Sequence, residues 1–358
     1  MRLFLWKKKL DIKFDPTIPK VLFDNKLTII FSTYQAGRLM MIGSSDGYNI
    51  QQTPIGYKKP MGIAVEENRI AIASFDEISF YTSNDHIIDT ANLKKFDRMY
   101  LYRASYNTNT LDIHDIHFDQ SGVWGVNTLF SCLCKFTLQS SFSPRWKPPF
   151  ITDIVPEDRC HLNGLALENN KPKYVTALSS TDHKDGWRED IMNSGILMDV
   201  TTNEILCENL AMPHSPRIIN NELYFLESAR GKLFKWNSVK KEKELIYNFN
   251  RFIRGIKHYK GILFIAFSKI RENSKSFNKV EVKENSKNAG FTIFDLRTKT
   301  SFGELLYNTT IDEIYDLNII EGCHKPGMIT KSNKNNKNII VTPQSVFWKK
   351  IKNDNQKH

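Results

Sequence analysis

Short runs of apolar residues recur along this chain, and turns rich in Gly, Asn, Asp and Ser separate them. The runs are rich in β-branched and aromatic residues, which favour strands. No stretch shows the 3.6-residue apolar periodicity of an amphipathic helix over about twelve residues. The pattern therefore predicts an all-β protein.

Six of these segments share one form, in which a polar or glycine-containing turn runs directly into an apolar strand. They are residues 61–65, 114–118, 163–167, 215–219, 254–258 and 315–319. The second residues of successive segments lie 39 to 61 positions apart, about 51 on average. A repeat of this length that contains several short strands is typical of propeller blades.

The two ends of the chain complete each other. The last segment supplies an inner strand at 313–320 with little strand sequence directly after it, whereas the N-terminal region supplies strands at 27–33, 38–43 and 48–55 with no inner strand before them. Joining them completes a sixth blade and hides sheet edges. We therefore predict an N-terminal extension at 1–25, a six-bladed β-propeller at 26–322 and a partly flexible C-terminal appendage at 323–358.

Composition narrows the class of protein. The chain has 358 residues, of which 41% are hydrophobic and 25% charged, as in ordinary globular domains. Five cysteines are too few, and odd in number, for a disulfide-stapled scaffold. No run reaches the ~18–20 apolar residues of a membrane-spanning helix, and the N-terminus lacks the apolar core of a signal peptide. We expect a cytoplasmic protein with no membrane span.

The net charge of +11 raises the question of nucleic-acid binding. Much of the excess lies in Lys-rich pieces at 7–9, 240–243, 275–287 and 331–337, several of them also Asn-rich. These pieces have almost no interleaved aromatic residues and are typical of solvated loops. The distribution argues against nucleic acid as a partner.

In an up-and-down blade, the starts of the inner strands and the loops between second and third strands lie on one face. Chemistry-bearing residues gather at both places in this sequence. At strand starts they are His114, Asp115, His161, Asn163, His214, Arg217, Arg254, Glu313 and Asp316, and in the loops they are Tyr34, Gln35, Asn127, Trp187, Arg188 and Arg271. This convergence predicts an axial pocket, because loops on a rigid scaffold carry function.

Structural explanations stand beside the functional ones. Channel-facing histidines serve either structure or ligand, and Arg217 or Arg254 can pair with Asp115, Glu313 or Asp316 in an ion network. His117 and His258, further along their strands, are expected to be satisfied core or interface residues. Cys132 and Cys134 share one face of a strand and indicate packing, and Cys160 is expected to be structural rather than reactive.

A metal site is a further hypothesis. His114, His161 and His214 come from three consecutive blades and would meet near the axis, with Asp115 or Glu313 as a fourth ligand. Imidazole with one carboxylate suits a divalent metal ion such as zinc, iron, manganese or copper. No compact local metal motif, nucleophile elbow or phosphate-binding glycine loop is present in the sequence.

Several motifs together resemble a bacterial conserved-hypothetical family that is sometimes joined to tetratricopeptide repeats. The motifs are STYQAG at 32–37, DIHD at 112–115, VNTLFS at 126–131, SPRWKPPF at 143–150, PEDRCHLNG at 156–164, VTAL at 175–178, MPHSPR at 212–217, RG at 254–255, SKIRE at 268–272 and EIYD at 313–316. The resemblance covers residues 25–325 and implies a propeller-like domain without an assigned reaction.

Two functions follow as hypotheses. The first is an enzyme whose axial pocket binds a small anionic or peptide-like substrate. In it, His114, Asp115, His161, His214 or Glu313 would act as acid, base or metal ligand, and arginines would orient charge. The second is a non-catalytic module that binds a partner protein or peptide on the same face. The oligomeric state, the reaction and the metal are not encoded in any motif found.

Overall fold

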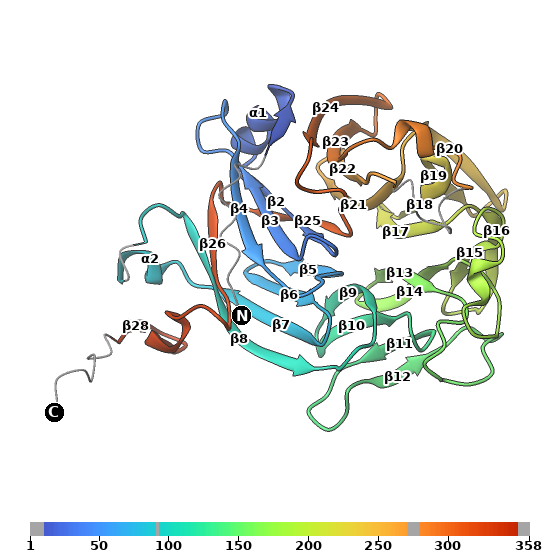
Figure 1. Ribbon diagram of the computed structural model, residues 1–358, viewed down its shortest axis with the longest axis horizontal. Coiled ribbons are helices and arrows are strands. Elements are labelled where there is room, and N and C mark those ends of the chain that lie inside the picture. The colour runs from blue at the N-terminus through green and yellow to red at the C-terminus, as the bar shows by residue number, and fades with distance from the viewer. Residues whose placement is uncertain (1–10, 91–92, 271–278, 350–358) are drawn as a thin grey trace.

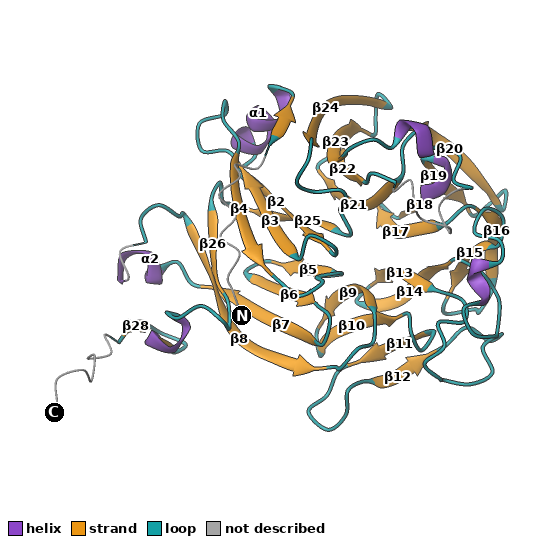
Figure 2. Cartoon of the chain, in the orientation of Figure 1, coloured by secondary structure: helices purple, strands orange, loops and turns teal. Residues whose placement is uncertain are grey.

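The computed structural model describes residues 11–90, 93–270 and 279–349, and strands dominate it (Figure 1, Figure 2). Blade 1 is β25 (Leu317–Glu321), β2 (Leu27–Thr33), β3 (Arg38–Gly43) and β4 (Gln51–Gly56). Blade 2 is β5 (Ile63–Glu66), β6 (Arg69–Ala73), β7 (Glu77–Ser83) and β8 (Arg98–Asn107), with β26 (Pro326–Ile329) outermost. Blade 3 is β9 (Ile113–Asp119), β10 (Gly122–Asn127), β11 (Cys132–Lys135) and β12 (Ser143–Trp146).

The second half of the ring follows the same order. Blade 4 is β13 (Leu162–Glu168), β14 (Lys171–Ala177), β15 (Gly195–Asp199) and β16 (Ile205–Leu210). Blade 5 is β17 (Pro213–Ile219), β18 (Glu222–Glu227), β19 (Lys232–Asn237) and β20 (Glu242–Asn248). Blade 6 is β21 (Ile253–Tyr259), β22 (Ile262–Phe267), β23 (Ala289–Asp295) and β24 (Thr300–Tyr307), with β1 (Ile12–Phe14) outermost.

The inner strands close a ring. Each contacts the next in the cycle β5, β9, β13, β17, β21, β25 and back to β5. The closing blade is built from both ends of the chain, because β25 pairs with β2 from Leu27 opposite Glu321 to Phe31 opposite Leu317. The predicted six-bladed propeller and its closure by N-terminal strands and a C-terminal inner strand are thus confirmed.

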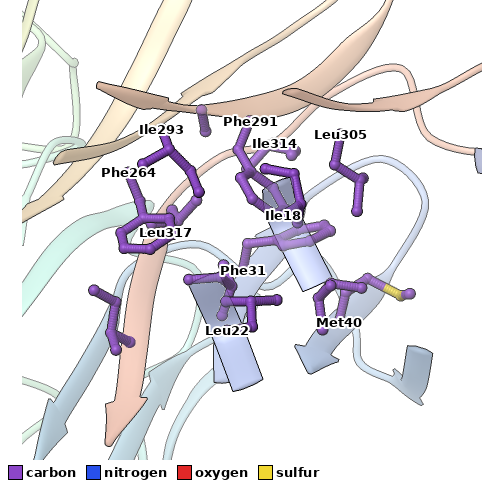
Figure 3. Packing of buried hydrophobic residues seen from close by; sticks show 14 of the residues in the cluster. Ile18, Leu22, Phe31, Met40, Phe264, Phe291, Ile293, Leu305, Ile314 and Leu317 are labelled. Carbon is purple, nitrogen blue, oxygen red and sulfur yellow. The ribbon is translucent and has the colours of Figure 1, made fainter. Parts of the chain in front are cut away.

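The N-terminal segment adds a short helix that the apolar pattern did not predict. Helix α1 (Thr17–Asp24) buries Ile18 and Leu22, which lie four residues apart on one face. Both contact the apolar core between blades 1 and 6 (Figure 3). The labelled partners in this core are Phe31, Met40, Phe264, Phe291, Ile293, Leu305, Ile314 and Leu317. The helix therefore fills the junction at which the ring closes.

The flanking segments also extend two sheets. β1 pairs antiparallel with β24, and β26 pairs parallel with β8. Helix α2 (His86–Thr90) and the hairpin of β27 (Ile339–Val341) and β28 (Val346–Trp348) form a satellite cluster outside blade 2, around Ile87, Met99 and Ile329. The boundaries at 26 and 322 stay predictions, and pieces of both flanks pair with blades.

Candidate functional site

The inner strands of blades 3 to 6 are irregular where they begin. Their pairing with the second strand shifts register near Ile113, Leu162, His214 and Ile253. A β-bulge bends a strand and re-aims its side chains. The shifts lie at one end of the axis, which we name the entry mouth.

Positive φ angles accompany these irregularities. They occur at Asp112, His161, Met212 and Ser215, with φ of 51–52°, and at Gly255 with φ of 78°. Non-glycine residues rarely adopt this conformation, and it clusters at functional sites. Gly255 permits it without a side-chain clash, since a Cβ there would lie 3.1 Å from the Leu317 nitrogen.

A cavity of about 450 Å³ opens at the entry mouth, and we name it the entry cavity. Its size falls in the usual range of small-molecule sites. Seven of the residues predicted from the sequence line it: Gln35, His161, Trp187, Arg188, His214, Arg254 and Glu313. The structure thus brings side chains from blades 1, 4, 5 and 6 and their loops to one space.

His161 is held by a carboxylate. Its Nδ1 lies 2.8 Å from Asp158 Oδ2, and the same oxygen accepts a hydrogen bond from Trp187 Nε1 at 2.9 Å. The rings of His161 and Trp187 are 4.2 Å apart. Because Nδ1 donates to Asp158, the neutral imidazole carries its lone pair on Nε2.

His114 and His214 have matching environments. His214 Nδ1 lies 2.9 Å from the Met212 carbonyl and 3.0 Å from Ser228 Oγ. His114 Nδ1 lies 3.1 Å from the Asp112 carbonyl and 2.8 Å from Thr128 Oγ1. In each case the carbonyl is two residues upstream and the hydroxyl fourteen downstream, so Nδ1 carries the proton.

Burial and nearby positive charge keep both of these histidines neutral. Burial lowers the pKa of His214 well below its usual value, and the charge of Arg254 adds to this. Burial likewise lowers the pKa of His114, with smaller effects from His161 and Arg254. The His114 ring does not line the entry cavity and packs edge-on against His161, with ring centres 4.7 Å apart.

Arg254 supplies a positioned positive charge. Its guanidinium carbon lies 3.6 Å from the ring centre of Tyr315, which is buried. Arg188 stacks similarly over Trp187 at 4.0 Å. Lys269 also lines the entry cavity and lies 3.9 Å from Asp312. The remaining walls are apolar: Leu178, Trp187, Met212, Phe252 and Ile270.

Other predicted residues lie deeper and tie neighbouring blades together. Asp115 Oδ2 accepts from the Leu165 amide and from Arg217 Nη1, both at 3.1 Å. Asn163 donates to the Pro213 carbonyl at 3.1 Å. These bonds join blade 3 to blade 4 and blade 4 to blade 5.

Asp316 makes the same kind of tie. Its Oδ2 accepts from the Ile63 amide at 2.9 Å, which joins blade 1 to blade 2. Arg217 Nη2 lies 4.0 Å from Asp316 Oδ1, so Arg217 stands between the carboxylates of Asp115 and Asp316. Arg217 therefore takes part in an ion network with Asp115 and Asp316, which was the structural alternative considered for it.

The remaining predicted residues lie apart from the entry cavity or outside the description. Asn127 is buried and accepts from the Phe130 amide at 3.1 Å. Tyr34 stacks on Tyr315 with ring centres 6.0 Å apart. Arg271 lies outside the described residues.

The structure lends no support to a metal centre. Among residues 11–90, 93–270 and 279–349, no group of three or more His, Cys, Asp or Glu side chains is arranged to hold a metal ion. The Nδ1 atoms of His114, His161 and His214 all face protein partners. The metal site on these histidines stays a prediction, and no step below uses it.

The structural interpretation holds for His258 and the cysteines, whereas Nε2 of His117 is buried with no hydrogen-bond partner among the described residues. His258 Nε2 accepts from the Gly261 amide at 2.9 Å and closes its own turn, and His117 Nε2 lies 3.1 Å from Asp115 Oδ1. Cys132 and Cys134 pack in one core cluster. Burial raises the pKa of Cys160 to about 12, as expected for a structural thiol.

Sequence reasoning did not single out Asp158, Tyr315 or Ser268. One spacing would have pointed to Ser268. The pairs His114–Thr128, His214–Ser228 and Arg254–Ser268 each join an inner-strand start to a hydroxyl fourteen residues later. In the first and last pair the hydroxyl donates to the next inner segment, at Leu162 and Ile314 respectively.

Comparison with known proteins places the chain in a family. The family described as "Domain of unknown function (DUF4915)" matches residues 16–329, and the chain belongs to it. No curated protein matches the chain. Among solved structures, a chain of "Crystal structure of Nidogen/Laminin Complex" is similar, with 10% identity and a TM-score of 0.51 over 82% of this chain and 98% of that one. At this identity the likeness supports the fold alone.

Within the described residues, no helix has the length and apolarity to span a membrane.

Proposed function

We propose that this member of the DUF4915 family is an enzyme that binds a small organic anion with an apolar body in the entry cavity. His161 acts on the bound molecule as a general base. One observation carries the proposal: a single cavity of about 450 Å³ is lined by Arg254 and by a histidine whose Nδ1 is fixed by a carboxylate.

Binding rests on charge and shape. Stacking on Tyr315 fixes the plane of the Arg254 guanidinium, whose fork of donors matches a carboxylate. Apolar walls at Met212, Phe252 and Ile270 suit a hydrocarbon body next to that charge. A small carboxylic acid with a branched or aromatic side chain fits both features.

Base chemistry rests on the Asp158–His161 pair. The carboxylate holds the Nδ1 proton, which leaves Nε2 to accept a proton and stabilises the imidazolium that results. We assign Nε2 the removal of a proton from a carbon next to a carbonyl group. The electron pair moves to the carbonyl oxygen, and the charge of Arg254 stabilises the enolate.

The test uses one probe for both steps. We choose 4-methyl-2-oxopentanoate, which combines a carboxylate, an apolar body and exchangeable C3 protons. Calorimetry measures its binding, and NMR in D2O follows deuterium entering C3. Arg254→Gln should weaken binding by at least tenfold, consistent with the loss of a charged hydrogen bond of about 1.5–3 kcal/mol. His161→Gln should keep binding and lower the exchange rate by about 10²–10⁴-fold.

Matched controls separate these effects from misfolding. Arg103→Gln, at an exposed position on outer strand β8, should leave binding and exchange unchanged. The neutral ketone 4-methylpentan-2-one should bind poorly. If neither this acid nor hexanoate or phenylacetate binds the wild-type chain, the anion site is wrong. Binding without exchange would refute the base and favour the non-catalytic ligand- or peptide-binding alternative.

A further inference from the structure

A second cavity lies along the axis beyond the inter-blade ties, and we name it the far cavity. Its volume is about 220 Å³, and all six inner strands contribute to its walls. Its polar side chains include His117 from blade 3, Arg217 from blade 5, and Lys257 from blade 6. None of these three lines the entry cavity, so the far cavity is a separate space.

Lys257 differs from the other charged groups near the axis. Arg217 is engaged by Asp115 at 3.1 Å and by Asp316 at 4.0 Å. The side-chain Nζ of Lys257, by contrast, makes no hydrogen bond or ion pair with any residue that the structure describes. Its amine therefore faces the far cavity without a partner.

The surroundings of Lys257 favour the neutral amine. Burial lowers the pKa of Lys257, and the positive charge of Arg217 lowers it further. The carboxylates of Asp316, Glu321 and Asp115 act in the opposite direction but do not cancel these effects. A lysine desolvated beside another cation is the arrangement that activates an amine as a nucleophile.

We propose that Lys257 is a nucleophilic lysine that forms an imine with a small aldehyde or ketone entering the far cavity. Nζ attacks the carbonyl carbon, a C–N bond forms and the carbonyl electron pair moves to oxygen. The nitrogen passes one proton to this oxygen and a second proton comes from solvent, so that the C–O bond breaks, water leaves and an iminium ion remains. His117 of blade 3 lines the same cavity as Lys257 of blade 6.

The iminium product suits the site. It carries one positive charge, which the nearby carboxylates Asp115 and Asp316 stabilise. The far cavity holds only a small molecule, which restricts the partner to short-chain carbonyl compounds. This activity uses none of the groups of the entry cavity and does not depend on the function proposed above.

Reductive trapping tests the proposal on the full wild-type chain. Acetaldehyde at limiting concentration and cyanoborohydride are added at pH 7, and peptide mass spectrometry measures ethylation of each lysine over time. Lys257 should react faster than the exposed Lys171 and Lys184, because a lowered pKa leaves more of the amine neutral at pH 7. The advantage should shrink as the pH rises toward 10.

Two comparisons make the result decisive. Lys257→Arg replaces the amine with a guanidinium that stays protonated, and it should remove the fast adduct while leaving the rates at Lys171 and Lys184 unchanged. Circular dichroism and melting temperature establish that this variant folds. Labelling of Lys257 at or below the rate of the exposed lysines in the wild-type chain overturns the proposal, whatever the variant does.

Discussion

Asp316 gives the most quantitative prediction. This carboxylate is buried directly before the inner strand of the closing blade, and it accepts hydrogen bonds from the Ile63 amide at 2.9 Å and the Leu317 amide at 2.8 Å. Burial raises its pKa from the usual 3.8 to about 6, and the negative charge of Asp115 adds to this while Arg217 opposes it. The group therefore titrates near neutrality in the folded chain.

The sign follows from proton linkage. Between pH 3.8 and 6 the folded chain binds a proton at Asp316 more tightly than the unfolded chain does. The stability that this proton contributes is fully present below pH 3.8 and is lost as pH rises through 6. For a rise of about two pKa units, the stability lost relative to low pH is about 3 kcal/mol at pH 7 and about half of that at pH 5.

Asp316→Asn removes this dependence. The amide offers one oxygen in place of two, so one of the two backbone amides loses its partner at a cost of about 1–3 kcal/mol at every pH. Urea unfolding of wild type and variant at pH 5 and pH 7 isolates the titration. Between pH 5 and pH 7, the free energy of unfolding of the wild type should fall by about 1 kcal/mol relative to that of the variant.

Comparing the wild type with Asp316→Asn also cancels the contributions of other titrating groups. His114 and His214 have lowered folded pKa values, so their contribution is present above pH 6.5 and lost as pH falls, and it is common to both proteins. Asp153→Asn, at an exposed position, should run parallel to the wild type. Parallel curves for Asp316→Asn as well would show that Asp316 does not titrate in this range.

Three further predictions concern the scaffold. Leu22→Ala should lower the free energy of unfolding in urea by about 2–5 kcal/mol, because α1 fills the ring closure, and a loss below 1 kcal/mol would argue against that role. Gly164→Ala should cost about 1–3 kcal/mol, since its Cβ would lie 2.5 Å from Pro216 Cδ of the next blade; an unchanged melting temperature would contradict this close approach. Iodoacetamide at pH 8 should label Cys207 in the folded chain, and fast labelling of a second thiol would count against burial of the other four. Those four are Cys132, Cys134, Cys160 and Cys323.

The apolar pattern was sufficient to predict the blades. Strands predicted at 27–33 and 38–43 match β2 and β3 residue for residue, because each is a continuous buried run ended by turn residues. The pattern missed α1, since eight residues give too few turns for a helical period to stand out. It also missed β26, whose parallel pairing with β8 joins residues more than two hundred positions apart.

The candidate site was predicted in its location more than in its detail. Of the strand-start residues that were placed at one mouth, His161, His214 and Arg254 line the same cavity. Residue type alone did not separate these groups from Asp115 and Asp316, which are equally polar and equally close to strand starts. Their separation depends on bulges, and a bulge adds no recognisable residue to the sequence.

Those bulges explain how two adjacent residues make contacts of different kinds. Within blades 3 and 5, His114 and His214 turn Nδ1 toward their own upstream carbonyls, while the next residues, Asp115 and Ser215, bond the following blade at Leu165 and Gly255. In a regular strand, neighbouring side chains also point to opposite faces of the sheet. One of the two side chains would then pack against an adjacent blade. With one residue outside the ladder, both neighbours reach the axis region at different depths. The deeper ties hold the blades in register and thereby fix the positions of the groups that line the entry cavity.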